Sequence, residues 1–165
     1  MIAQVARVAG AGHVRLIEPN ASRRQAALSL GADSVYAGYQ EMLDATSGRG
    51  EDYVIEATNS PEGPEHAALV ARIGGRVTLV GIPTGDQITL SAANLRRKGL
   101  TIKLSRRMGH VYPRAIELVT QGRVNLAPIA SHAYPLERAG GAFEFASRTP
   151  PGFLKAIIQP DSPGR

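Results

Sequence analysis

Residues 53–83 read YVIEATNSPEGPEHAALVARIGGRVTLVGIP. The stretch begins and ends with apolar runs rich in β-branched residues, at residues 53–57 and 76–83, which is typical of buried strands. Between them Pro64 suits the first turn of a helix, and residues 67–73 carry an apolar stripe that the following glycine pair would end. The stretch therefore predicts strand, helix, strand, the repeating unit of a parallel sheet.

The same alternation continues on both sides of this unit. Ser22 is a candidate N-cap for the second helix, and Pro135 a candidate start for the last one. The predicted elements are helix 2–9, strand 13–18, helix 22–31, strand 35–36, helix 41–46, helix 91–97, strand 100–105, helix 113–122, a helix from residue 135, and strand 153–159. We therefore expect an α/β fold, a doubly wound parallel sheet covered by helices on both faces, followed by an α+β segment.

Composition narrows the class of protein. The chain has 165 residues, 43% of them hydrophobic, which suits one core. It contains 0 Cys, which excludes disulfide frameworks, thiolate zinc sites and cysteine nucleophiles. No apolar run is long enough for a membrane span, and Arg7 interrupts the only stretch resembling a signal peptide. We expect a soluble, cytoplasmic chain without a membrane partner.

Charge is strongly segregated along the chain. Residues 33–65 carry eight acids and one arginine, a net charge of −7, whereas residues 87–116 carry seven basic residues and no acid. The basic segment is a candidate contact for nucleic acid or an acidic partner. Tyr112 is its only aromatic residue, so it offers no stacking platform, and nucleic acid is the less favoured reading.

Glu18 follows the predicted strand 13–18 directly. In a doubly wound sheet, an acid at the end of the second strand is placed to bind the ribose hydroxyls of adenosine, and it repels the 2′-phosphate of NADP. The pattern therefore favours NAD over NADP, although a plain surface acid at a strand end fits the residue type equally well.

Four stretches resemble a known family: residues 15–33, 48–58, 74–83 and 134–139. In order and spacing they are similar to the C-terminal half of the zinc-type, medium-chain alcohol and polyol dehydrogenases, with sorbitol and threonine dehydrogenases as the nearest types. The resemblance covers residues 1–160. It implies a partial Rossmann domain at residues 1–105 and a segment at 106–160 that packs on the catalytic domain. The remaining tail, residues 161–165, is expected to be disordered because it is terminal and rich in proline, glycine and polar residues.

The resemblance also assigns residues to an NAD site. Glu18 would be the ribose acid, and Arg23 the basic residue beside the adenosine. The run Val80, Gly81 and Ile82 would lie along the nicotinamide ribose, where a glycine lets the backbone approach the cofactor because it has no Cβ.

Two further arginines match a cofactor-contacting strand end of the polyol dehydrogenases. Arg106 and Arg107 occupy that end, and Arg107 stands where those enzymes place an arginine near both cofactor and substrate. Met108 replaces the tyrosine of the polyol enzymes, which weakens the expectation of a polyol substrate. A solvated basic face or a dimer contact is the alternative for both arginines.

The glycine-rich phosphate loop of a dinucleotide site should follow the first strand and open a helix. Gly10 and Gly12 do not fit it, because they end a predicted helix and Arg15 stands where the third glycine belongs. The resemblance places Met1 inside the first Rossmann helix, with the central first strand upstream. Two apolar edges, at residues 14–17 and 54–57, would then lack a neighbouring strand.

A catalytic metal site is not expected. The four histidines have no ligand spacing, so each is expected to be a surface or hydrogen-bonded residue, and in the resembled family the zinc ligands come from the N-terminal half. We therefore expect no zinc ligand and no catalytic residue in this chain.

The sequence thus favours the cofactor-binding part of an NAD-dependent dehydrogenase acting on a secondary alcohol or polyol, inactive by itself. An interaction module built on residues 87–116, or a gene fragment with its true start upstream, are the alternatives. Five apolar residues in the C-terminal segment have no catalytic domain to pack on within this chain. They would either form a smaller core of their own or form an exposed patch that drives association. These residues are Ile116, Val119, Leu136, Phe143 and Ile157.

Overall fold

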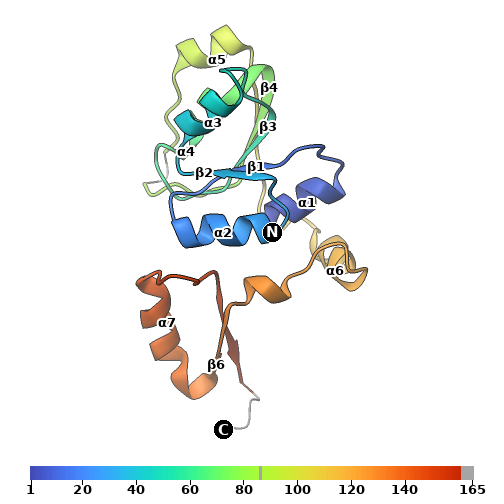
Figure 1. Ribbon diagram of the computed structural model, residues 1–165, viewed down its shortest axis with the longest axis vertical. Coiled ribbons are helices and arrows are strands. Elements are labelled where there is room, and N and C mark those ends of the chain that lie inside the picture. The colour runs from blue at the N-terminus through green and yellow to red at the C-terminus, as the bar shows by residue number, and fades with distance from the viewer. Residues whose placement is uncertain (86, 161–165) are drawn as a thin grey trace. The chain divides into compact units, whose positions relative to one another are not determined.

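The computed structural model describes residues 1–85 and 87–160, so the expected tail at 161–165 lies outside the described residues. It divides into two compact units, one combining Met1–Ala37 with the segment from Tyr112 onward, the other Gly38–Val111 (Figure 1). The first unit contains α1 (Ile2–Val8), β1 (Arg15–Ile17), α2 (Ala21–Ser29), β2 (Ser34–Tyr36), α6 (Tyr112–Thr120), η1 (Ala127–Ile129), β6 (His132–Pro135), η2 (Leu136–Arg138), α7 (Ala139–Ser147) and β7 (Ala156–Gln159). The second contains α3 (Tyr39–Ala45), β3 (Glu51–Glu56), α4 (Gly63–Val70), β4 (Ala71–Leu79), α5 (Ala92–Lys98) and β5 (Thr101–Leu104).

Every strand pair in the described residues is parallel. The sheets are β1-β2, β3-β4-β5 and β6-β7, and a helix lies between successive paired strands along the chain. This confirms the α/β fold class. Strand β6 is absent from the sequence prediction, which took Pro135 as a helix start. Pro135 is instead the last residue of the strand, and the helical turn begins one residue later.

The pairing of β1 and β3 concerns the two edges that were expected to lack a neighbouring strand. Among the described residues, β1 is hydrogen-bonded only to β2, and β3 only to β4. The register aligns Leu16 with Val35 in the first pair and Val54 with Val77 in the second. In the part of the chain that the structure describes, each of these two strands therefore pairs along one edge.

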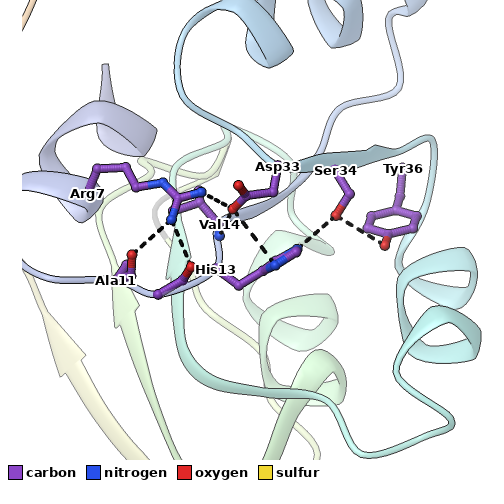
Figure 2. A network of polar contacts seen from close by, with 8 residues as sticks. Arg7, Ala11, His13, Val14, Asp33, Ser34 and Tyr36 are labelled. Carbon is purple, nitrogen blue, oxygen red and sulfur yellow. Dashed lines mark hydrogen bonds and ion pairs between the residues drawn. The ribbon is translucent and has the colours of Figure 1, made fainter.

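A polar network fastens α1 to the start of β2 (Figure 2). The carboxylate of Asp33 accepts a hydrogen bond from the backbone of Val14 at 2.6 Å and forms an ion pair with Arg7. Arg7 also donates to the carbonyl oxygens of Ala11 and Gly12, at 3.0 and 2.8 Å. The Val14 hydrogen bond, reinforced by Arg7, lowers the pKa of the Asp33 carboxyl.

The glycines near the N-terminus end a helix, as predicted. Helix α1 stops at Val8, and Gly10 adopts a left-handed φ of 96°. The amide of Gly10 donates to the carbonyl of Arg7, so the turn closes on the last helical residues. The cap of α2 differs from the expectation: Asn20, not Ser22, is the N-cap, and its side-chain oxygen accepts from the Ser22 amide at 3.0 Å.

The core of the second unit lies on one face of its sheet. Ala67 of α4 packs against Ala71, Val77 and Leu79 of β4, with Val54, Leu100 and Ile102 around them. The other face carries the exposed side chains of Tyr53 and Ile55. Among the described residues of this unit, the helices that pack on the sheet therefore lie on the face opposite Tyr53 and Ile55.

The boundary between α4 and β4 also corrects the sequence prediction. The helix ends at Val70 and β4 begins at Ala71, so the glycine pair lies inside the strand and does not stop the helix. Glu51 pairs with Ala71 but Tyr53 pairs with Arg76, so the intervening residues of β4 form a bulge. Gly74, with a φ of 69°, makes this bulge possible and leaves Ile73 74% exposed.

The C-terminal segment has a small aromatic cluster of its own. His132 packs against Phe145 and Phe153, with ring centroids 4.9 and 5.7 Å apart. The predicted apolar candidates Ile116, Val119, Leu136 and Phe143 are exposed, while Ile157 is half-buried in β7. No helix in the described part of the chain is both long and apolar enough to cross a bilayer.

Candidate functional site

Glu18 lies directly after β1, where the sequence placed it. Its backbone amide donates to the carbonyl of Tyr36 at 3.0 Å, which extends the pairing of β1 with β2 by one residue. Its Oε1 accepts from the amide of Asn20 at 2.9 Å. The side chain is partly exposed, and within the described residues Oε2 has no hydrogen-bond partner. One carboxylate oxygen is thus held in place and the other is available to a ligand.

Arg23 lies in the first turn of α2, and its backbone amide donates to the capping oxygen of Asn20. Its side-chain Nε is buried without a hydrogen-bond partner among the described residues. The neighbouring Arg24 is different, because it donates to the carbonyl oxygens of Glu18 and Pro19 at 2.8 and 2.7 Å. A buried donor without an acceptor costs about 1–3 kcal/mol, so the Arg23 Nε favours a bound acceptor.

The second unit holds a mainly apolar pocket of about 210 Å³ at the carboxyl ends of β4 and β5. The two strand ends are joined by the amide of Ser105, which donates to the carbonyl of Leu79 at 2.9 Å. Ligands of open parallel sheets bind at such carboxyl ends. The lining residues are Leu79, Val80, Gly81, Ile82, Ile88, Leu104, Ser105 and Arg107.

Four residues selected from the sequence meet in this pocket: Val80, Gly81, Ile82 and Arg107. Arg106 is exposed and does not line it. The wall is apolar on the β4 side and carries one guanidinium after β5. The apolar wall suits a planar ring, and the guanidinium suits a polar or negatively charged group beside that ring.

Close packing against the loop after β3 explains why position 81 is a glycine. A Cβ built on it would lie 1.9 Å from the carbonyl oxygen of Thr58 and 2.5 Å from Oε2 of Glu56. The amides of Val80 and Gly81 both donate to the backbone carbonyl of Glu56, at 2.8 and 3.1 Å. The pocket wall is therefore fixed against the end of β3.

Sequence reasoning missed Glu56 and Thr58. Oε1 of Glu56 accepts from the amide and the hydroxyl of Thr58, at 2.7 and 2.6 Å, and the side chain is 6% exposed. The available signal was an acid at the inward-facing end of an apolar strand, followed at once by a hydroxyl residue. A buried carboxylate requires such donors.

In the basic segment 87–116, some cationic side chains bind within the fold and others are exposed. Lys98 reaches three backbone carbonyls around the end of α4, and burial lowers its pKa. Arg96, Arg97 and Lys103 are exposed. One cation of the proposed interaction surface therefore has a role inside the fold.

No three His, Cys, Asp or Glu side chains within the described ranges are grouped to hold a metal ion. One exposed and one hydrogen-bonded histidine fit the expectation of surface or hydrogen-bonded residues. His66 stacks on Tyr39 with ring centroids 4.5 Å apart, and Nδ1 of His132 lies 2.9 Å from the hydroxyl of Ser131. The donor set present here does not fit a catalytic zinc, which needs three protein ligands.

Comparison with known proteins places this geometry in a family. The family model described as zinc-binding dehydrogenase matches residues 1–121. The sorbitol dehydrogenase of Bacillus subtilis is 26% identical over 166 residues, covering 98% of this chain and 47% of that protein. The L-threonine 3-dehydrogenase of the same organism is 30% identical over 152 residues, covering 87% of this chain and 44% of that protein.

A solved structure agrees in fold. A protein of Sinorhizobium meliloti 1021, assigned to the zinc-binding dehydrogenases and bound to NADP, matches with a TM-score of 0.81 and 26% identity, over 96% of this chain and 48% of that one. The chain spans about half the length of the relatives it matches. The family match extends over both units, from α1 to the end of α6. The chain belongs to the zinc-binding dehydrogenase family.

Proposed function

We propose that this chain is the NAD-holding part of a dehydrogenase that oxidises a secondary alcohol. The observation that carries the proposal is the apolar pocket at the carboxyl ends of β4 and β5, which gathers Val80, Gly81, Ile82 and Arg107. In this position of a parallel sheet, apolar walls bind the faces of a planar ring and exclude water from it. NAD supplies the hydride acceptor when bound.

The nicotinamide end of the cofactor is assigned to this pocket. Val80 and Ile82 supply side-chain surface, and Gly81 supplies a wall of bare backbone, since its Cα is pressed against the end of β3. Arg107 adds the one charged group among the lining residues. Its guanidinium is suited to a ribose hydroxyl, a phosphate or a substrate oxygen.

The adenosine end is assigned to Glu18 and Arg23. The free Oε2 of Glu18 is an acceptor for ribose hydroxyls, and the unpaired Nε of Arg23 is a donor. The carboxylate would also repel the 2′-phosphate of NADP, so we propose NAD as the preferred cofactor. Arg106 is exposed and does not line the pocket, so the structure supports a cofactor contact for Arg106 less than for Arg107.

The substrate class follows from the relatives. The names sorbitol dehydrogenase and L-threonine 3-dehydrogenase both denote oxidation of a hydroxyl compound, and both compounds carry secondary hydroxyl groups. The described residues supply no three-ligand metal site. We therefore propose that this chain alone holds the cofactor without oxidising an alcohol. From the resemblance to the family, we also propose that residues 106–160 pack on a catalytic domain.

The test is a fluorescence titration of the purified chain with NADH. The chain contains 0 Trp and 5 Tyr, so NADH emission is read against a low protein background. The proposal expects saturable binding that added NAD displaces. Emission that rises only in proportion to added NADH, with no displacement, would contradict it.

A further inference from the structure

Glu56 is the one charged side chain that is buried in the part of the chain that the structure describes. It is the last residue of β3, and its Oε1 accepts from both the amide and the hydroxyl of Thr58, at 2.7 and 2.6 Å. A buried carboxylate is stable only when donors surround it. Here the donors come from the loop that leaves the strand.

Two glycines make room for this carboxylate. A Cβ built on Gly63 would lie 2.7 Å from Oε1 of Glu56, and a Cβ built on Gly81 would lie 2.5 Å from Oε2. Both distances are far too short for real contacts, so neither position accepts a side chain without a shift. The carboxyl group is thus enclosed between the backbone at the start of α4 and the backbone that follows β4.

The same residue holds the pocket wall through its main chain. The Glu56 carbonyl accepts from the amides of Val80 and Gly81, and both residues line the pocket. Farther out, the amide and hydroxyl of Thr84 both donate to the Asn59 carbonyl at 3.2 Å. The loops after β3 and β4 are therefore linked at two levels.

We propose that Glu56 is a positioning residue for cofactor binding. Its carboxylate sets the position of Thr58 on one side and of Gly81 on the other, and so fixes the backbone wall of the pocket. This role rests on the proposed NAD-binding function. It supports the shape of the pocket and does not select between cofactors. A smaller side chain would leave the Thr58 donors unpaired and let the Gly81 backbone move into the vacated space.

The experiment compares NADH affinity with stability in variants of the full chain. Glu56→Ala is expected to weaken NADH binding about tenfold or more, and Glu56→Gln, which keeps the shape and the Oε1 acceptor, to stay within about threefold of the wild type. The matched control is Glu65→Ala. Glu65 also accepts two hydrogen bonds, from the amide of Ser91 and the side chain of Asn94, but does not line the pocket. It should lower the melting temperature and leave NADH affinity unchanged.

Thr58→Val provides a second test if Glu56→Ala does not fold. It removes the hydroxyl donor with little change of shape and should weaken NADH binding several-fold. NADH affinity that is unchanged in a folded Glu56→Ala variant, or in Thr58→Val, overturns the inference while the proposed function stands. Wild-type chain that does not bind NADH overturns both.

Discussion

The ammonium of Lys98 lies 2.8 Å from the carbonyl oxygen of Ala71, at the point where α4 passes directly into β4. The same group donates to the carbonyls of Ala68 and Leu69. Carbonyls at the end of a helix lack intrahelical donors, and a cation there also complements the helix dipole. Lys98 therefore caps α4 from the end of α5.

Lys98→Met should destabilise the second unit by roughly 2 kcal/mol, because three carbonyls lose a charged donor and methionine supplies no replacement. Urea denaturation of the two proteins measures the difference. Arg97→Met is the control, since Arg97 is the exposed neighbour on the same helix. Equal stability of the two variants would show that the Lys98 contacts add nothing.

Acid should remove part of the stability through Asp33. The hydrogen bond from Val14 and the ion pair with Arg7 hold the pKa of its carboxyl below the ordinary value of 3.8. A carboxyl whose pKa is lower in the folded state stabilises the protein above the unfolded pKa, and this stabilisation is lost as the pH falls through the folded pKa. Melting temperatures of wild type and Asp33→Asn should therefore converge as the pH falls below about 4.

The control for this pH series is Asp44→Asn on α3, outside the Arg7 network. Its melting temperature should follow that of the wild type through the same acid range. A gap between wild type and Asp33→Asn that stays constant down to the lowest pH would contradict the assigned role of Asp33.

Glu18→Ala should weaken NAD binding about tenfold, because a charge-assisted acceptor for the ribose hydroxyls is lost. It should also narrow the gap between NAD and NADP, because the repulsion of the 2′-phosphate disappears. Calorimetric titration with both cofactors measures this, with the exposed acid variant Glu144→Ala as control. Unchanged affinity for both cofactors would reduce Glu18 to a surface acid.

Gly81→Ala should destabilise the second unit by about 1–3 kcal/mol and reduce NADH binding, since the new methyl group would overlap the Thr58 carbonyl. Gly109→Ala is the matched control, because a Cβ built there meets nothing within 4 Å. Denaturation curves that coincide for the two variants would disprove the close packing at Gly81.

The basic segment 87–116 should not act as a nucleic-acid surface. Lys98 donates to backbone carbonyls at the end of α4, and Tyr112 is the only aromatic residue in the segment, so the segment offers no stacking platform. A gel shift with duplex DNA at about 50 mM salt is expected to show no complex. A complex that weakens steeply as salt is raised would instead favour the interaction-module alternative.

Local patterns predicted most of the helices and strands, whereas the candidate site residues came mainly from the resemblance to a known family. The local pattern predicted the strand that ends near Val80, but only the resemblance to the dehydrogenase family selected Val80, Gly81 and Ile82 as cofactor residues. Glu18 was selected from its place directly after the second predicted strand, and the resemblance gave it the same role. The signals for strands and helix ends are contained in a few consecutive residues, so the sequence displays them directly.

Contacts between distant residues account for what was missed. The end of α4 depends on Lys98, 27 residues beyond Ala71, and no local pattern shows that pairing. Glu56 reads as an ordinary acid until its enclosure by Gly63 and Gly81 is known. Asn20 and Ser22 are both good capping residues, and only the backbone geometry selects the first.

The most direct test of the central claim is a thermal melt of the wild-type chain with and without excess NAD. A ligand that binds only the folded state at a hundredfold excess over Kd adds about 2.7 kcal/mol of stability. The melting transition is expected to be cooperative and to move upward with NAD, and the upward shift is expected to be smaller in Glu18→Ala. A cooperative transition that NAD leaves unmoved would contradict the claim that this chain holds the cofactor.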